Sequence, residues 1–186
     1  GPGYERWLKV HNLKEAAKTL TYLTEHGITE YAALEKLVAE QNGKRDAAVT
    51  TIRQYERRME RIADLRTHIV NYAKTHDIYL QYRKLPAAKK AAFEAAHENE
   101  LMLHHAAKQA FEEYGEKKLP AMKDLQAQYK ELLEKKRVAY AEYRPLKQQA
   151  QELETVKKNV DSLLQIDAAQ QEREAEKRRC EQSQAR

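Results

Sequence analysis

The stretch MKDLQAQYKELLEKKRVAYAEYRPLKQQAQEL, residues 122–153, carries the clearest structural pattern in the chain. Side chains that can pack together recur in it at alternating spacings of three and four, which places them on one side of an α-helix. The repeating positions are Met122, Leu125, Tyr129, Leu132, Lys136, Ala139, Tyr143, Leu146, Ala150 and Leu153, followed by Val156, Val160 and Leu163. This pattern predicts a heptad seam with one polar member, Lys136, in a long helix that Pro145 should bend.

A second stripe of the same kind lies earlier in the chain. It comprises Ala48, Ile52, Tyr55, Met59, Ile62, Leu65, Ile69, Tyr72, His76 and Tyr79. Two consecutive three-residue steps, from Met59 to Ile62 to Leu65, predict a local phase shift in this stripe. Tyr72 and Tyr79 lie seven residues apart on the face of Ile69, which favours a packing role over a catalytic pair.

Glycine and proline mark the predicted helix ends. A first helix over residues 4–26 should end at Gly27, and Thr29 is a candidate N-cap for the next helix. Helical pattern resumes directly after Asn42-Gly43, which favours a continuous helix there. The segment Leu85-Pro86 should separate that helix from a third over residues 86–114, and the segment 115–120 should separate the third from the last.

These boundaries predict an all-α fold in which short connections make each helix fold back on its predecessor. Residues 1–43 are expected to form a helical hairpin. Residues 44–166 are expected to form an elongated antiparallel three-helix bundle with coiled-coil-like packing. Residues 167–186 are expected to be a charged tail, either disordered or a frayed helix, because apolar residues nearly vanish there.

The composition excludes several classes of protein. The single cysteine, Cys180, rules out a disulfide framework and favours a reducing compartment. No apolar run approaches the ~18 residues that a membrane span requires, and no leader for export is recognisable. The expectation is therefore a cytoplasmic chain without a membrane span, and one that forms a piece of a longer protein.

The charge of the chain is unevenly distributed. Residues 44–90 contain twelve Lys and Arg against five Asp and Glu, whereas residues 91–115 contain one base against five acids. The two segments could pair as antiparallel helices, or they could leave one basic face free for phosphates. The cations proposed to contact DNA are Arg53, Arg57, Arg58, Arg61, Arg83, Lys84, Lys89 and Lys90. The alternative is a solvated coiled-coil face on which Glu56 and Glu60 are intrahelical partners.

No residue pattern indicates a metal site. Glu94 and His97 match the Glu-x-x-His pattern of di-iron helical bundles, but those sites need a second copy and none exists. His97 and His104 share a helix face about 10 Å apart, too far to bind one ion, and the adjacent His104 and His105 diverge around the helix.

No pattern indicates catalysis either. The chain has no Gly-rich phosphate loop and no nucleophile elbow. The sequence therefore predicts no catalytic residue, no metal and no cofactor.

Four phrases carry a family resemblance: GYERWLKVHNLKEAAKTLTYLTEHGI, LRTHIVNYAKTHDIYLQYRK, KKLPAMKDLQAQYKELL and VKKNVDSLL. In order and spacing the chain resembles, over roughly residues 3–164, the C-terminal helical region of MobA-like relaxase/mobilisation nuclease proteins of Gram-positive conjugative transposons. In that family an N-terminal nuclease domain nicks the transfer origin with a tyrosine and a histidine-bound metal. The His-x-His metal motif is missing from this chain, so no catalytic residue carries over.

The resemblance implies a non-catalytic accessory domain of a conjugative relaxase in the bacterial cytoplasm. Such a domain would contact transfer-origin DNA, recruit the relaxase to the coupling protein and type IV secretion machinery, or do both. The alternative is a structural coiled-coil module that binds other proteins without nucleic acid, including a homo-dimer formed through the apolar stripes. A third hypothesis, a metal-dependent helical enzyme, predicts stoichiometric metal in the purified protein.

Overall fold

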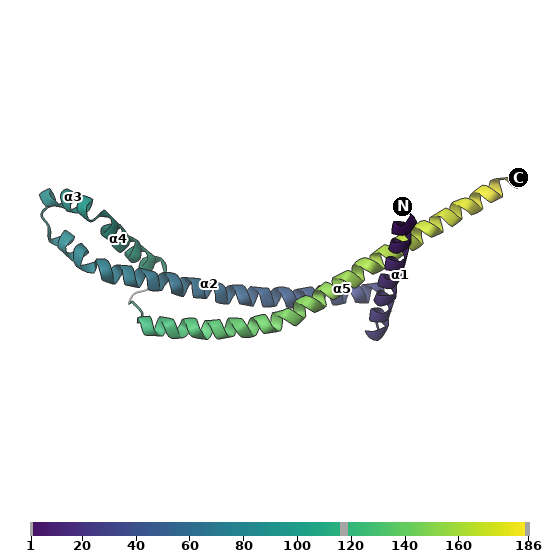
Figure 1. Cartoon of the computed structure of the whole chain (residues 1–186), viewed down its shortest axis with the longest axis horizontal. Coiled ribbons are helices and arrows are strands. Elements are labelled where there is room, and N and C mark those ends of the chain that lie inside the picture. Colours follow the sequence, from purple (N-terminus) through teal and green to yellow (C-terminus); the bar gives the residue numbers. More distant parts are fainter. Residues whose placement is uncertain (1, 116–118, 185–186) are drawn as a thin grey trace. The chain divides into compact units, whose positions relative to one another are not determined.

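The computed structural model describes residues 2–115 and 119–184. Side chains are described within those ranges except for residues 2–11, 166, 167, 170 and 180–184. The described residues form helices and no strand, which confirms the all-α prediction (Figure 1). The helices are α1 (Pro2–Glu25), α2 (Tyr31–Lys84), α3 (Ala87–Ala96), α4 (Glu98–Glu113) and α5 (Met122–Gln184).

Glycine ends two of these helices, as the sequence predicts. Gly27 follows α1 with a φ of 63°, and Gly115 follows α4 with a φ of 69°, a backbone conformation that side chains with a Cβ rarely adopt. After Gly27, the Ile28 amide donates to the Leu23 carbonyl at 2.8 Å, which satisfies one of the last carbonyls of α1. Helix α2 begins at Tyr31, so Thr29 lies outside it and is not its N-cap.

Two long helices pass through residues that usually interrupt helices. Helix α2 continues through Asn42-Gly43, which confirms the prediction of a continuous helix. Helix α5 continues through Pro145 and on to Gln184, so the charged residues after Asp167 are helical as far as the structure describes them.

The predicted third helix over residues 86–114 is wrong as a single element. It is divided into α3 and α4 at His97, whose backbone angles, φ −129° and ψ 31°, are not helical. The His97 amide still bonds to the carbonyls of Phe93 and Glu94, which closes α3. Two glutamates in the first turn of α4 favour a helix start there, because they face the positive end of the new helix dipole.

The chain divides into two compact units, and each draws on both α2 and α5. The first unit comprises residues up to Val49 together with those from Glu142 onward, and the second comprises Thr50–Ala141. These units are defined by contacts, and they cut across the ranges 1–43, 44–166 and 167–186 expected from breaks and charge. We describe each unit by itself.

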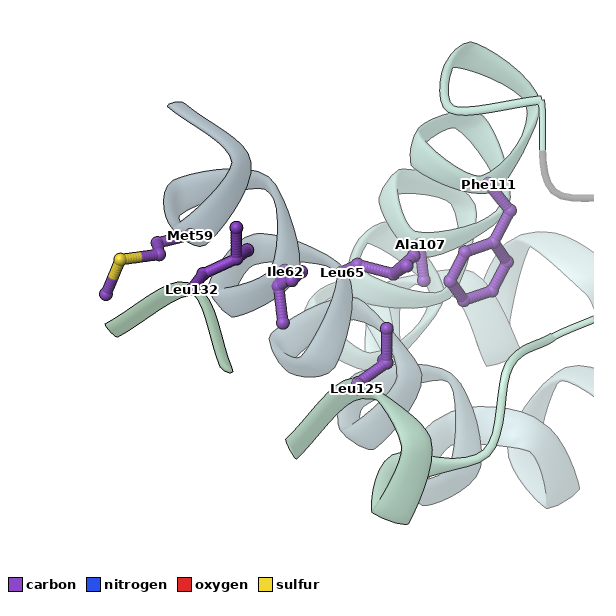
Figure 2. Close-up of a cluster of buried hydrophobic side chains, with 7 residues drawn as sticks. All are labelled: Met59, Ile62, Leu65, Ala107, Phe111, Leu125 and Leu132. Atoms are coloured by element: carbon purple, nitrogen blue, oxygen red, sulfur yellow. The ribbon is translucent and has the colours of Figure 1, made fainter. Parts of the chain in front are cut away.

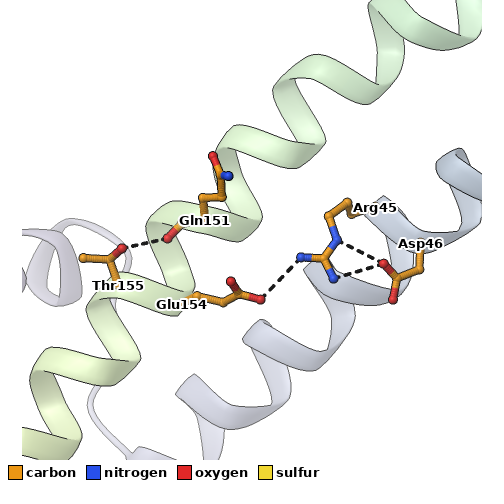
Figure 3. A network of polar contacts seen from close by, with 5 residues as sticks. All are labelled: Arg45, Asp46, Gln151, Glu154 and Thr155. Atoms are coloured by element: carbon orange, nitrogen blue, oxygen red, sulfur yellow. Dashed lines mark hydrogen bonds and ion pairs between the residues drawn. The ribbon is translucent and has the colours of Figure 1, made fainter.

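The core of the first unit joins α1, the start of α2 and α5. Leu34, Leu153 and Val156 are almost fully buried in it, and Tyr22, Leu23, Ile28, Leu37, Val38 and Val160 pack around them. A partly buried polar contact also joins α1 and α5 in this unit, where Asn159 donates to the hydroxyl of Thr19 at 3.0 Å. Arg45 of α2 forms salt bridges with its neighbour Asp46 at 3.0 Å and with Glu154 of α5 at 3.4 Å (Figure 3).

The core of the second unit is a layer in which three helices meet. Its buried residues are Met59, Ile62 and Leu65 of α2, Ala107 and Phe111 of α4, and Leu125 and Leu132 of α5 (Figure 2). The phase shift predicted at Met59, Ile62 and Leu65 therefore lies where α2 contacts both other helices. A changed spacing rotates the apolar stripe around the helix, which lets α2 face two partners at once.

Elsewhere in the second unit, α2 contacts different helices along its length. Toward its C-terminal end Thr75 contacts His104 of α4, and toward its N-terminal end Glu56 contacts Lys136 of α5. The predicted elongated antiparallel bundle of three long helices is therefore not confirmed. The physical reason is that the break at His97 shortens the middle helix to the 16 residues of α4.

The heptad seam of α5 is confirmed by burial. Leu125, Leu132, Ala139, Ala150 and Leu153 are buried, and the aromatic members between them are half-buried. Lys136, the polar member, forms a salt bridge with Glu56 at 2.9 Å, and this contact lowers the pKa of the Glu56 carboxyl. Leu163 is 39% exposed, so the seam ends before it.

Candidate nucleic-acid interface

The eight predicted DNA-binding cations all lie in the second unit. Seven of them are exposed and Lys90 is half-buried. Four, from Arg53 to Arg61, lie on α2 beside the three-helix core. The other four flank the turn between α2 and α3: Arg83, Lys84, Lys89 and Lys90. From Arg61 to Arg83 the rise of α2 is about 33 Å, so the cations form two groups and not one patch.

Arg53, Arg57 and Arg58 present charge to solvent in the first group. Arg53 and Arg57 are four residues apart, which places their side chains one above the other on the same helix face. Within residues 2–115 and 119–184, Arg57 forms no salt bridge. The pKa of Glu56 is lowered chiefly by Lys136 and only slightly by Arg53, so Lys136 is the main partner of that carboxylate.

Arg58 borders a groove between α2 and α5. The groove has a volume of about 240 Å³ and is lined by Arg58, Arg61, Ile62, Leu65, Leu125 and Gln128. Across from α2, the pKa of Glu131 is lowered mainly by Lys135 and only slightly by Arg58. Arg53, Arg57 and Arg58 therefore keep most of their capacity to bind an anion.

Arg61 is held by the protein itself. Its Nη2 donates to the Tyr114 carbonyl at 2.7 Å, and its guanidinium carbon lies 4.8 Å from the centre of the Tyr114 ring. Tyr114 is the C-cap of α4, so a cation there complements the negative end of the helix dipole. The Tyr114 hydroxyl in turn donates to Asp64 at 2.6 Å, and this bond raises the tyrosine pKa. Arg61 thus fastens the end of α4 to α2.

We expect Arg61→Lys to lower the free energy of unfolding by roughly 1 kcal/mol, because lysine lacks the planar fork that stacks on Tyr114 while bonding its carbonyl. Chemical denaturation of the full chain measures this change. The matched control is Arg57→Lys, which should leave stability unchanged. Equal stability of the two variants would show that the Arg61 contact does not hold α4.

The second group of cations surrounds aromatic rings at the α2–α3 turn. The Lys90 ammonium lies 5.0 Å from the centre of the Tyr82 ring, and the Phe93 ring lies 6.4 Å from the same ring. The Tyr82 hydroxyl donates to Glu94, which raises the tyrosine pKa. Lys90 is therefore used in packing α3 against α2. Arg83, Lys84 and Lys89 are the exposed cations of this group.

The sequence patterns missed one buried polar residue, His104. It is fully buried and stacks between Tyr72 and Tyr79 of α2. The spacing of Leu101, His104, Ala107 and Phe111 was the available signal, because it places the histidine on the apolar face of α4. Within the described part of the chain, no group of three or more His, Cys, Asp or Glu side chains could hold a metal ion.

Two further findings bear on the class of protein. Among the residues that the structure describes, no helix has both the length and the apolar character to cross a membrane. No protein-family model, no curated protein and no solved structure matches this chain.

Proposed function

We propose that this chain is a non-catalytic accessory domain of a conjugative relaxase, and that its second unit binds the phosphate backbone of transfer-origin DNA in the bacterial cytoplasm. The observation that carries the DNA-binding part is the exposed arginine group Arg53, Arg57 and Arg58 on one helix. The relaxase assignment is supported by the four sequence phrases, and no catalytic residue or cofactor is part of the proposal.

The chemistry of these arginines suits phosphate binding. A guanidinium can bond two phosphate oxygens at once, and each neutralised phosphate releases condensed counterions, which gives affinity without sequence information. The arginines lie on a rigid helix whose opposite face is fixed by the core residues Ile52 and Met59. Arg83 and Lys84 at the end of α2, together with Lys89 on α3, form a second contact point.

The test is a DNA-binding titration at several salt concentrations with the full chain and with the triple variant Arg53→Gln, Arg57→Gln and Arg58→Gln. We expect the variant to bind all DNA sequences more weakly. Its plot of log affinity against log salt should be shallower by about one unit for each phosphate contact removed.

A second triple variant provides the matched control. Lys130, Lys135 and Arg137 lie on α5 in the same unit, and Lys135 and Arg137 already pair with Glu131 and Glu134. Changing these three to glutamine removes the same charge, so the affinity of this variant should remain close to that of the parent chain. Equal losses in both variants, or no binding by the parent chain at low salt, would contradict a DNA contact on α2.

One observation favours the recruitment role as a second candidate. Large apolar side chains lie exposed on α4 and α5, among them Met102 at 60%, Val138 at 53% and Leu133 at 49%. Such side chains are typical of surfaces that bind other proteins, here the coupling protein, the secretion machinery or a second copy of the chain. Light scattering across a range of concentrations tests the homo-dimer: a constant monomer mass would exclude self-association.

A further inference from the structure

His104 is the central contact between α4 and α2. Its ring centre lies 4.6 Å from that of Tyr72 and 4.1 Å from that of Tyr79, and both pairs are stacked. Its side chain is completely shielded from solvent. A histidine in this position fills the space between two aromatic rings and also carries two polar nitrogens into the interior. The hydrogen-bond partner and the protonation of each nitrogen therefore have to be identified.

Thr75 determines which nitrogen carries the proton. Its hydroxyl lies 2.7 Å from the Asn71 carbonyl, an acceptor only, so the hydroxyl proton is donated there. The same oxygen lies 3.0 Å from Nδ1 of His104 and must then accept a hydrogen from it. Neutral His104 therefore carries its proton on Nδ1, and Nε2 is unprotonated and carries a lone pair. Nε2 is buried and has no hydrogen-bond partner among the described residues.

The groups around the imidazole oppose a second proton. On α2 this group is His76, whose ring centre is 6.2 Å from that of His104, whereas the Tyr72 and Tyr79 rings stack on the imidazole. From α4 come His105 and Lys108, and the Lys108 ammonium lies 5.4 Å from the centre of the Tyr79 ring. Burial chiefly, and then His76, His105 and Lys108, lower the pKa of His104. None of these surrounding groups is a carboxylate that could accept the new N–H.

We propose that His104 is a pH switch in the packing of α4 on α2, in which the neutral ring holds the two helices together and the protonated ring releases α4. Protonation creates a charged N–H at Nε2 with no acceptor, close to other cations, and the cost of burying such a group is relieved when α4 separates and exposes the ring to water. This inference does not depend on the DNA-binding proposal.

The direction of the pH dependence follows from the lowered pKa of His104. The unfolded chain, with an ordinary histidine pKa near 6.5, takes up the proton before the folded chain does. The stability that His104 contributes is therefore complete above about pH 6.5, and it is lost as the pH falls through the lower pKa of the folded state.

Amide hydrogen exchange of the full chain at about pH 7.5 and about pH 5 tests the switch, after correction for the intrinsic pH dependence of exchange. We expect amides of α4 to lose protection at the lower pH, because the lowered pKa of His104 makes the released helix the form that takes up the proton. Amides of the first unit, such as that of Leu34, should change much less. Equal losses in both units would overturn the inference.

Two variants and one titration sharpen the test. His104→Phe keeps a ring between Tyr72 and Tyr79 but cannot be protonated, so the pH dependence of α4 protection should flatten. The matched control, His105→Phe, changes the exposed neighbour, which contributes less than burial to the lowered pKa of His104, so this variant should keep most of the parent pH dependence. Because His104→Phe could fold poorly, NMR titration of the seven histidines in the parent chain gives an independent answer. The pKa of His104 should lie below the ordinary histidine value of about 6.5, and a value at or above 6.5 would contradict the switch.

Discussion

Leu132→Ala is expected to lower the free energy of unfolding of the second unit by about 2–5 kcal/mol. Leu132 is only 3% exposed and belongs to the layer in which α2, α4 and α5 meet. Removing three carbon atoms there leaves a cavity that the neighbouring Met59 cannot fill without moving α2 and α5 together. Since this layer is the main core of the second unit, the expected loss is a large fraction of the total free energy of unfolding of that unit.

The neighbouring leucine supplies a matched control for this substitution. Leu133 lies on the same turn of α5 but is 49% exposed, so Leu133→Ala should change stability by no more than about 0.5 kcal/mol. Urea denaturation followed by circular dichroism measures both variants. Similar losses for the two would show that Leu133 is covered in solution, for example by a partner copy, and that the single chain does not define the buried face of α5.

The helices and their buried faces were predictable because they depend on local chemistry. The alternating spacing of Leu125, Leu132, Ala139 and Leu153 reports which side of α5 is apolar, and that side is buried in the structure. The positive-φ glycine after α1 is likewise a local requirement of the backbone. Helical periodicity fixes the face that a helix buries, whichever helix covers it.

The apolar spacing does not show which helix covers each buried face, because this depends on where the neighbouring helices begin and end. The spacing at Met59, Ile62 and Leu65 indicated a phase shift, but it did not say that α4 and α5 meet there. That outcome follows from the end of α3 at His97, inside an alanine-rich stretch without glycine or proline. The helix propensity of the alanines favoured a continuous helix, and the acidic first turn of α4 was too weak a signal to overrule it.

The sequence identified the charged residues of the candidate interface, but it could not show which of them are already held in contacts within the protein. Sequence alone makes Arg57 and Arg61 equivalent, since both lie on the same face of α2 away from the core. The structure distinguishes them because the end of α4 places the Tyr114 carbonyl beside Arg61 only. His104 was missed for a similar reason: its burial requires Tyr72 and Tyr79, which lie about thirty residues away in the sequence.

Pro145→Ala is expected to raise the free energy of unfolding by about 2 kcal/mol. Proline in a helix interior costs about 3 kcal/mol relative to alanine, because its nitrogen cannot donate to the carbonyl four residues earlier and its ring crowds that turn. The carbonyl concerned belongs to Ala141, inside the continuous helix α5. Proline also restricts the unfolded chain, so replacing it makes the unfolded state more favourable and reduces the gain in stability by about 0.4–1 kcal/mol.

The exposure of Pro145 makes the sign of this effect clear. Its side chain faces solvent, so the substitution removes no packed contact that could offset the restored hydrogen bond. Thermal unfolding followed by circular dichroism should show a higher midpoint for Pro145→Ala, whereas Gln148→Ala, an exposed change in the same helix, should shift it little. A lower midpoint for Pro145→Ala would mean that the ring supports a bend on which the packing of α5 depends, because only the loss of a required bend could outweigh the gain of a helical hydrogen bond.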